Sequence, residues 1–308
     1  MNTLRSPESI DELTQYYQLR WQILRKPWQQ PLGSEQDEHD KCSIHRMFID
    51  EHGTVQAVGR LEKINSQLAK IRYMAVSKHL QGQGLGKKII IELEQQAMRL
   101  GFVEITLNAR ENTLEFYQKL GYKSQGLSHT LFGVIKHFRL TKKLTKHPQH
   151  QDKKAQALTV LWHKTIEMSK AMNLQISYFD GKTLITHCDA KFNKNLHNTM
   201  FAGSIYTLAT LTGWGWVYFA LQKLTRVDGD IVLAQADIRY HSPIKGLTFA
   251  KVDIAQVSGS FDNLVQGKKA RIKLTVNVFC GEHIAATFNG SYFILPKSPD
   301  DFERIVNK

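Results

Sequence analysis

Helical and strand-like spacings of hydrophobic residues alternate along the first 144 residues of the chain. The pattern predicts a helix, the two strands of a hairpin and a third strand over residues 11–24, 47–50, 55–61 and 69–76. The Lys26-Pro27 step ends the helix, because the residue before a proline avoids helical angles. Gly53 marks the turn of the hairpin.

A glycine-rich loop and a second helix follow the third strand. The helix carries an apolar face and ends at Gly101. Alternation over residues 103–107 predicts a half-buried strand. Asn112 can cap a short helix over residues 113–120, and a final strand is expected around residues 134–141.

The second half has a different pattern. A helix is predicted over residues 158–172, and strands are predicted over residues 174–180, 183–190, 231–240, 247–257, 270–280 and 284–295. One uncharged run, residues 200–221, lies among these strands. A long helix surrounded by antiparallel strands is an α+β arrangement.

The uncharged run is long enough for a helix to cross a bilayer. It also contains Ser204, three threonines and three glycines, and it is the only such run in the sequence. A helix enclosed by a sheet gives the same pattern, and we favour that interpretation.

Length and composition predict two globular domains. The 308 residues, 42% of them hydrophobic, suit two domains of about 150 residues each. Residues 142–156 are polar and basic without apolar periodicity, which indicates a connecting segment. We therefore assign residues 1–144 to a first domain, 145–156 to a basic linker and 157–308 to a second domain.

The formal net charge of +13 suits an acidic partner: coenzyme A phosphates, an acyl carrier protein, nucleic acid or anionic lipid. General surface basicity is the alternative. The three cysteines form no C-x-x-C pair, so no zinc site is predicted. Residues 1–12 are polar and acidic without a signal-peptide pattern, and we expect a cytoplasmic protein.

The loop after Val76 carries the clearest chemical signal. Its glycines let the backbone approach a ligand closely, and free amides at the start of the next helix favour an anion such as a pyrophosphate. A dinucleotide-binding Rossmann site would need an early βαβ unit and a later acidic residue, and neither is present. The loop reads Gln81-Gly82-Gln83-Gly84-Leu85-Gly86.

This loop, with Asn108-Ala109-Arg110-Glu111-Asn112 and Phe116-Tyr117-Gln118-Lys119-Leu120-Gly121-Tyr122, resembles the GNAT acyltransferase superfamily over residues 10–144. The resemblance implies a mixed sheet with helices on both faces. It implies that the strand segment Met74-Ala75-Val76 binds the pantetheine arm and that Gln81 to Lys87 hold the pyrophosphate. Asn112 would approach the pantetheine, and Tyr117 would protonate the leaving thiolate or pack as a half-buried aromatic residue.

A base for amine acetylation is not singled out by the sequence. Such a reaction needs a group that removes a proton from an ammonium. Glu35, Glu104 and Glu111 are available, and His45 either faces the site or caps its strand.

Residues 157–296 resemble a hotdog fold of the acyl thioesterase type, through the segment 195–204, which reads NLHNTMFAGS. The resemblance implies a helix wrapped by a sheet and a site shared by two protomers. The amides of Gly203 and Ser204 would polarise a thioester carbonyl, and Asn198 could orient water.

One position departs from that pattern. Many such thioesterases carry an acid where this chain has Thr210, and threonine is a poor base. Asp237 is a possible substitute, but it alternates with Arg239 and can equally be a solvated pair. Trp214 and Trp216 are interpreted as core. This half is therefore either a hydrolase or an acyl-binding and dimerising module.

The order GNAT then hotdog, with Arg20-Trp21, Leu24 and Arg25-Lys26-Pro27 near the start, resembles one bacterial two-domain family. Its members are described as acetyltransferase–thioesterase fusions, and some have been assigned malonyl-acyl carrier protein decarboxylase activity that primes fatty acid synthesis. Decarboxylation needs no metal, amine acceptor or strong base, only desolvation and donors to an enolate oxygen. Candidate polar groups are His45, Arg72, Asn108 and Tyr117.

Three hypotheses remain: decarboxylation of malonyl-acyl carrier protein or malonyl-CoA, N-acetylation by acetyl-CoA with or without thioester hydrolysis, and a non-catalytic acyl sensor. The first two imply a coenzyme A or phosphopantetheine thioester as substrate. Expected partners are an acyl carrier protein, acyl-CoA and a second copy of the chain, without nucleic acid or membrane insertion.

Overall fold

The structure is a computed structural model that describes residues 3–145, 153–189, 192–224 and 228–296. The chain divides into two compact units, residues 1–147 and 148–308. Residues 146–152 of the predicted linker and 297–308 of the predicted second domain lie outside the described residues.

The first unit is a seven-stranded mixed sheet with the strand order β1-β2-β3-β4-β5-β7-β6. Among the described strands of this sheet, only β4 and β5 pair in parallel. The strands are β1 (Thr3–Arg5), β2 (Ile44–Ile49), β3 (Val55–Lys63), β4 (Leu68–Val76), β5 (Glu104–Arg110), β6 (Lys123–Leu131) and β7 (Ile135–Lys143). The helices are α1 (Ile10–Leu24), α2 (Leu85–Arg99) and α3 (Leu114–Lys119), with short 3-10 turns η1 (Lys26–Trp28), η2 (Asp40–Cys42), η3 (Lys78–Leu80) and η4 (Glu111–Thr113).

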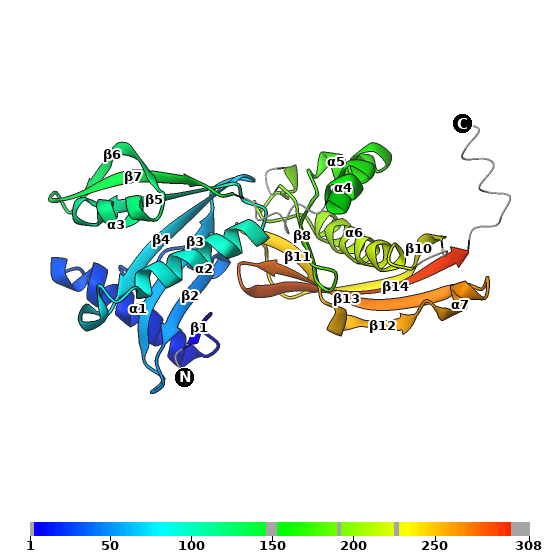
Figure 1. Cartoon of the computed structure of the whole chain (residues 1–308), viewed down its shortest axis with the longest axis horizontal. Helices are drawn as coiled ribbons and strands as arrows, with labels where there is room; N and C mark the ends of the chain where they lie inside the picture. The colour runs from blue at the N-terminus through cyan, green and yellow to red at the C-terminus, as the bar shows by residue number, and fades with distance from the viewer. Residues whose placement is uncertain (1–2, 146–152, 190–191, 225–227, 297–308) are drawn as a thin grey trace. The chain divides into compact units, whose positions relative to one another are not determined.

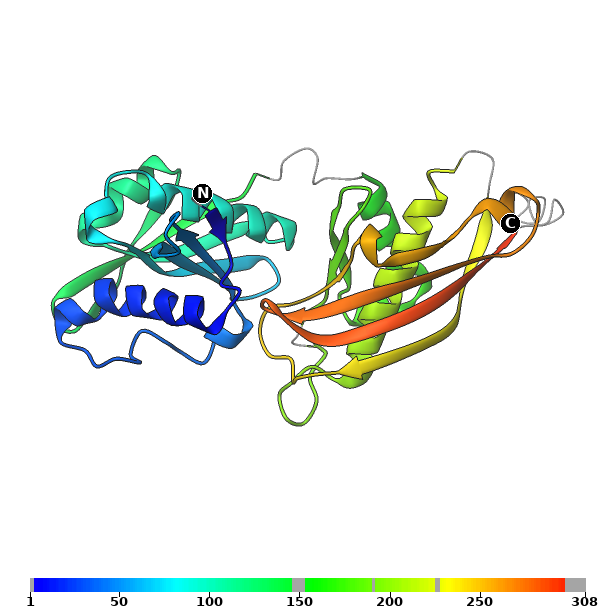
Figure 2. The same ribbon diagram turned by 90° about the horizontal axis from the view of Figure 1, so that it is seen from below.

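Two helices bury opposite faces of this sheet, because neighbouring residues of β3 point in opposite directions. Val58 belongs to the core cluster of α1 residues Tyr16 and Leu19. A Cβ atom on Gly59 would instead lie 2.7 Å from Ile89 of α2. Figure 2 shows α1 (blue) and α2 (cyan) on the two sides of the sheet.

The second unit is an antiparallel sheet with the order β10-β14-β13-β11-β9-β8, and β12 also pairs with β13. The strands are β8 (Gln175–Phe179), β9 (Leu184–His187), β10 (Gly229–Tyr240), β11 (Thr248–Val252), β12 (Val257–Ser260), β13 (Ala270–Cys280) and β14 (His283–Pro296). The helices are α4 (Lys153–Thr165), α5 (Glu167–Ala171), α6 (Ala202–Leu221) and α7 (Asp262–Val265), and η7 spans Ile254–Gln256.

The uncharged run forms α6, which packs across the strands of this sheet (Figure 1). Its other side meets α4, where Gly215 leaves room for the ring of the buried Trp162. Inside the core, Thr212 and the β9 residue Thr186 share a hydrogen bond of 2.6 Å. No helix among the described residues is long and apolar enough to cross a membrane. The α+β class, with a GNAT fold followed by a hotdog-like sheet around a long helix, is confirmed.

Several details differ from the sequence-based expectation, among them the strand predicted over residues 247–257, which η7 interrupts between β11 and β12. The structure adds β6, whose polar, largely exposed residues show no strand periodicity. The helix predicted over 158–172 is two helices, because Ile166 has an extended conformation. Residues 153–156, assigned to the linker, begin α4.

Candidate active site

A cavity of about 700 Å³ lies in the first unit where β4 and β5 separate. The two strands pair from Leu68 and Glu104 to Ile71 and Leu107, and beyond that point β5 continues only with β7. Residues 72–76 and 108–110 therefore line the cavity. An extended ligand can pair with the free edge of a strand in such a gap.

The conformation of Tyr73 shapes this part of β4. Tyr73 has a φ of 54°, in the left-handed region that non-glycine residues rarely adopt. The pairing register of β3 and β4 shifts at the same place, between Val58 and Arg60. The Tyr73 hydroxyl donates a hydrogen bond of 3.0 Å to Asp37, and its ring lies 3.8 Å from the Arg20 guanidinium. These contacts hold a strained residue at the cavity wall.

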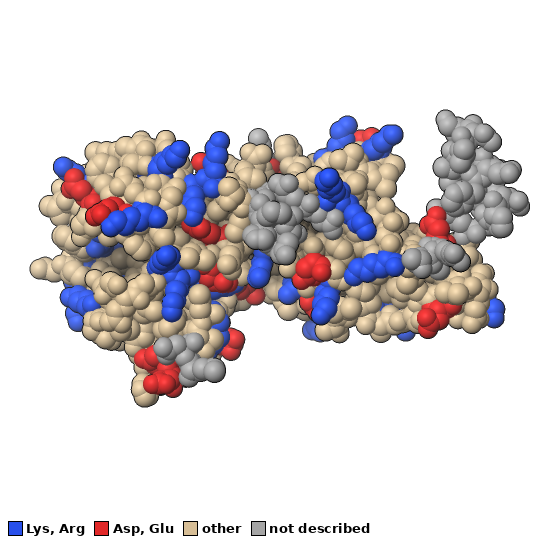
Figure 3. Space-filling view, in the orientation of Figure 1, with Lys and Arg blue, Asp and Glu red and all other residues tan. Residues whose placement is uncertain are grey.

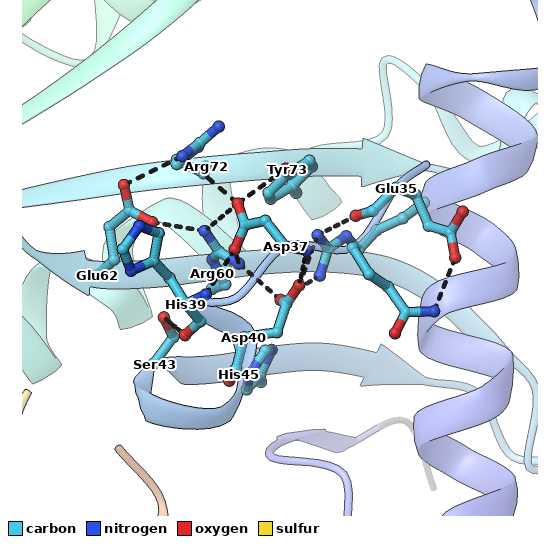
Figure 4. Close-up of polar contacts among 12 residues, drawn as sticks. Glu35, Asp37, His39, Asp40, Ser43, His45, Arg60, Glu62, Arg72 and Tyr73 are labelled. Carbon is cyan, nitrogen blue, oxygen red and sulfur yellow. Dashed lines mark hydrogen bonds and ion pairs between the residues drawn. The ribbon is translucent and has the colours of Figure 1, made fainter. Parts of the chain in front are cut away.

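Tyr73 and Arg72 both contact Asp37, which belongs to a buried ion network shown in Figure 4. Arg60 is fully buried and pairs with Asp37 at 2.6 Å and Asp40 at 2.7 Å. Arg20, also fully buried, pairs with Asp40 at 2.7 Å. Burial alone would raise the pKa of Asp37 and Asp40, but the neighbouring arginines outweigh it and hold both pKa values below their ordinary range. The network ties the segment after α1 to β3 and β4.

His45 belongs to this network and does not line the cavity. Its Nε2 lies 2.8 Å from the carbonyl oxygen of Asp40, and its ring meets Tyr16 edge to face. Glu35 accepts hydrogen bonds from Gly33 and Gln36, and Glu104 and Glu111 are also absent from the cavity wall. The geometry leaves His45 and these carboxylates out of the candidate site.

The glycine-rich loop borders the same cavity. Gly82 and Gly84 have φ values of 80° and 83°, so the turn uses conformations that favour glycine. Gly84 caps α2 without a side-chain hydrogen bond, and the first amides of the helix remain available to an anion. The lining includes Gln81, Gly82, Gly84, Leu85, Gly86 and Lys87. Gln83 does not line it, because its side chain bonds to the carbonyl of His79.

Tyr117 lines the cavity from α3, together with Asn108 and Asn112. Burial raises the pKa of Tyr117 to about 12, although the charge of Arg110 acts in the opposite direction. Its hydroxyl makes no hydrogen bond to a described residue. The Tyr117 hydroxyl is therefore protonated and neutral at physiological pH.

The cavity wall is cationic. Among the described residues that line it there is no aspartate or glutamate, whereas its cationic groups are Arg25, Lys70, Arg72, Lys87 and Arg110, and His129 and His137 also line it. The sequence analysis missed Arg25, Lys70, Arg110 and the two histidines as site residues. Both histidines come from the hairpin of β6 and β7, and β6 has no clear sequence pattern.

A hydrogen bond and the neighbouring charges determine the tautomer and the protonation state of His137. Its Nδ1 donates a hydrogen bond of 3.1 Å to the carbonyl of Ile135, which leaves Nε2 toward the cavity without a described partner. Burial and the charges of His129, Arg110 and Arg25 lower the pKa of His137. His137 is therefore neutral at pH 7.

In the second unit, the start of α6 presents the predicted amides. Gly203 and Ser204 lie in its first turn, and Phe201 caps the helix without a side-chain hydrogen bond. A Cβ atom on Gly203 would lie 2.5 Å from the Phe201 ring, so this position accommodates only glycine without rearrangement. Asn198 lies outside the helix in an exposed turn, where its amide donates to the carbonyl of Asn195.

Thr210 and Asp237, the two positions considered for a base in this unit, have different surroundings. The Thr210 hydroxyl is buried without a hydrogen-bond partner, and Asp237 accepts a hydrogen bond of 3.1 Å from the exposed Asn289 on the neighbouring strand. Trp216 is buried, and Trp214 packs against Trp162 and Tyr218, so both tryptophans are part of the core.

Basic side chains (blue) are spread over the face drawn in Figure 3, with acidic ones (red) among them, instead of forming a single stripe. Within the described segments, no group of three or more His, Cys, Asp or Glu side chains could hold a metal ion.

Two family models match the chain. Residues 13–122 match "Acetyltransferase (GNAT) family", and residues 155–296 match "Putative thioesterase (yiiD_Cterm)". The uncharacterized N-acetyltransferase YvbK of Bacillus subtilis (strain 168) is 33% identical over 81 residues, which are 25% of this chain. The chain spans about half, 51%, of that relative.

Solved structures also resemble each half. One is described as a "putative thioesterase" from Shewanella oneidensis; it is 42% identical with a TM-score of 0.45, over 47% of this chain and 100% of that chain. Another is an aminoglycoside 6'-N-acetyltransferase complexed with coenzyme A, 15% identical with a TM-score of 0.42, over 47% of this chain and 99% of that chain.

Proposed function

Since this chain joins a GNAT-family acetyltransferase domain to a thioesterase-family domain, we propose that its first unit converts a malonyl thioester to an acetyl thioester and carbon dioxide. The observation that carries this proposal is the cationic cavity wall without a carboxylate. An amine acceptor enters as an ammonium and needs a base, for which the described lining offers the neutral His137 but no carboxylate. A malonyl carboxylate is instead attracted by the positive charge of the cavity wall, and its decarboxylation needs no base.

The thioester would bind along the cavity by its carrier arm. The amides at the start of α2 and the adjacent Lys87 would hold a diphosphate or phosphopantetheine phosphate. The free edge of β4, residues 74–76, would pair with the pantetheine amides. This placement brings the thioester toward Asn108, Asn112 and Tyr117.

The reaction would break only the bond between the methylene carbon and the carboxyl carbon. Carbon dioxide leaves, and the electron pair moves into the thioester as an enolate. The side-chain amide of Asn108 is suited to donate a hydrogen bond to the enolate oxygen. Tyr117 gives a proton to the methylene carbon and regains one from water. The carbon–sulfur bond stays intact, so the product is the acetyl thioester.

For the second unit, we propose acyl-group binding and dimerisation. The amides of Gly203 and Ser204 can hold a thioester oxygen, while Thr210 supplies no base behind them. β10 forms one end of the sheet and leaves a 12-residue edge without a partner among the described strands. A long free edge favours pairing with a second copy.

The full chain should be mixed with malonyl-acyl carrier protein, and separately with malonyl-CoA. Carbon dioxide together with the acetyl thioester is the expected result. Malonate with a free thiol would mean hydrolysis. Acetyl transfer from acetyl-CoA to an amine, without carbon dioxide from malonyl thioesters, would replace the proposal with N-acetylation. A protein that binds these thioesters without turning them over would be an acyl sensor.

A further inference from the structure

Two arginines of the cavity wall have no acidic partner among the residues that the structure describes. Arg25 donates hydrogen bonds only to the backbone carbonyls of Ser34 and Leu24. Arg110, at the end of β5, makes no side-chain hydrogen bond or ion pair to a described residue. By contrast, Arg72 of the same wall pairs with Glu62 at 3.4 Å and Asp37 at 3.5 Å.

The two guanidinium groups interact electrostatically. Burial lowers the pKa of Arg110, and the charge of Arg25 lowers it further. Two like charges that share a partly dehydrated cavity repel, and a bound anion would offset both the repulsion and the lost hydration. The neighbouring His137 is neutral and adds no charge.

The position of the pair suits the far end of an acyl group. Arg110 lies close enough to Tyr117 for its charge to act on the pKa of that hydroxyl. Tyr117 is placed beside the thioester in the proposed function, and the phosphate loop occupies another part of the cavity lining. A carboxylate that two carbon atoms separate from the thioester sulfur would therefore lie close to the two positively charged arginines.

We propose that Arg25 and Arg110 form a carboxylate clamp, which selects acyl thioesters that carry a free carboxylate at the end of a short acyl chain. This inference rests on the proposed function and names the residues that determine its substrate class. The two guanidiniums stabilise the substrate carboxylate, and that charge leaves their neighbourhood when carbon dioxide departs and the enolate forms at the thioester. The clamp therefore acts on binding more than on the chemical step.

The test measures binding to the full chain by calorimetry, with stable amide analogues of malonyl-CoA and acetyl-CoA in which nitrogen replaces the thioester sulfur. The wild type should bind the malonyl analogue more tightly. Arg110→Gln should weaken its binding about 10- to 100-fold, as expected for a lost charged hydrogen bond, and leave the acetyl analogue unchanged. Arg25→Gln should act likewise. Arg139→Gln, an exposed site on β7 outside the cavity lining, is the matched control.

Arg110→Lys serves as the variant that keeps the charge, and it should restore part of the preference. Because the Arg110 side chain makes no hydrogen bond to a described residue, its replacement should not lower the melting temperature. A preference for the malonyl analogue that persists in both Gln variants would overturn the clamp. An equal loss of affinity for both analogues would also overturn it, because the arginines would then contact the coenzyme A part of the ligand and not the acyl group.

The clamp and the proposed reaction can fail separately. If carbon dioxide is released and the arginine variants keep the malonyl preference, only the clamp is wrong. If the preference depends on Arg25 and Arg110 but no malonyl thioester loses carbon dioxide, the clamp stands and the decarboxylation is wrong.

Discussion

Tyr117 is the residue on which the proposed chemistry most depends. Its ring packs against Phe116 and Tyr122, while its hydroxyl reaches a cavity that holds no carboxylate among its described lining. Burial keeps the hydroxyl protonated, since charge on a phenolate would be poorly solvated there. The same site therefore supplies an acid and lacks a carboxylate base.

Tyr117→Phe keeps the ring and removes the proton donor. We expect kcat for malonyl thioesters to fall by about 10²-fold or more, with KM nearly unchanged. Because the pKa of Tyr117 is raised to about 12, its ionisation should not limit wild-type activity at any pH well below that value. Tyr122→Phe is the matched control, since its hydroxyl donates to Glu94 outside the cavity lining. Full activity in Tyr117→Phe would remove it from the mechanism.

Gly84→Asp tests the phosphate loop. The change brings a negative charge to an anion site and should weaken coenzyme A binding at least about tenfold, measured by calorimetry. Gly53→Asp introduces the same residue at a similar φ of 78° in a distant hairpin, where a Cβ atom also meets open space. It should keep full affinity. Equal affinity in both variants would exclude the loop from the site.

At the scale of elements, buried ion pairs fix the positions of the segment between α1 and β2 and of the β4 bulge, which hydrophobic packing alone would not determine. The segment between α1 and β2 has little regular structure, but its carboxylates Asp37 and Asp40 bind Arg60 and Arg20. Those bonds fix the segment against β3 and hold the β4 bulge through Tyr73. A strained strand can persist at the cavity because its surroundings determine it.

Asp40→Asn should destabilise the first unit by about 3–5 kcal/mol, because it leaves two buried arginines without a full partner. Amide hydrogen exchange of peptides within residues 10–63 measures this unit separately. Since the folded pKa of Asp40 is below its unfolded value, its stabilisation is complete above about pH 4 and declines as the pH falls toward the folded pKa. The variant should lose part of that pH dependence.

Glu38→Gln, which alters a carboxylate 88% exposed, is the control for Asp40→Asn and should change neither stability nor its pH dependence. Protection in Asp40→Asn equal to that of the wild type would show that the network contributes no net stability.

At the scale of the whole molecule, the two units each have a core of their own, and the proposed chemistry resides in the first. In the proposed function, the start of α6 in the second unit binds a thioester, and among the described strands β10 has a long free edge. A free edge of this length is exposed to unwanted pairing unless a partner covers it. Dimerisation through β10 would provide such a partner.

Light scattering should give twice the chain mass of 35.3 kDa. Neighbouring residues of a strand point their amides in opposite directions, so Asp237→Pro and Ile238→Pro form a matched pair. One of the two prolines removes an N–H group that points to the free edge of β10, and that variant should be monomeric with an unchanged melting temperature. The second proline removes an N–H group that bonds to β14, and that variant should have a lower melting temperature. Dimers that persist in both variants would place the interface elsewhere.

Much of the fold could be predicted, because hydrophobic spacing reports local geometry. The helical spacing within residues 11–24 anticipated α1, and the uncharged run anticipated α6. β6 was missed because it is largely exposed and carries no apolar alternation. The loop with Gly82 and Gly84 was recognisable because glycine, by its conformational freedom, marks a turn that approaches a ligand.

The sequence by itself determined the two halves, their α+β class and the glycine-rich turn, because each depends on residues close together in the chain. Only the tertiary structure decided which charges share the cavity. Arg25 ends α1 and Arg110 ends β5, and no local pattern relates them. His45 was removed from the site for the same reason: its partner Asp40 lies in a buried network formed by distant segments.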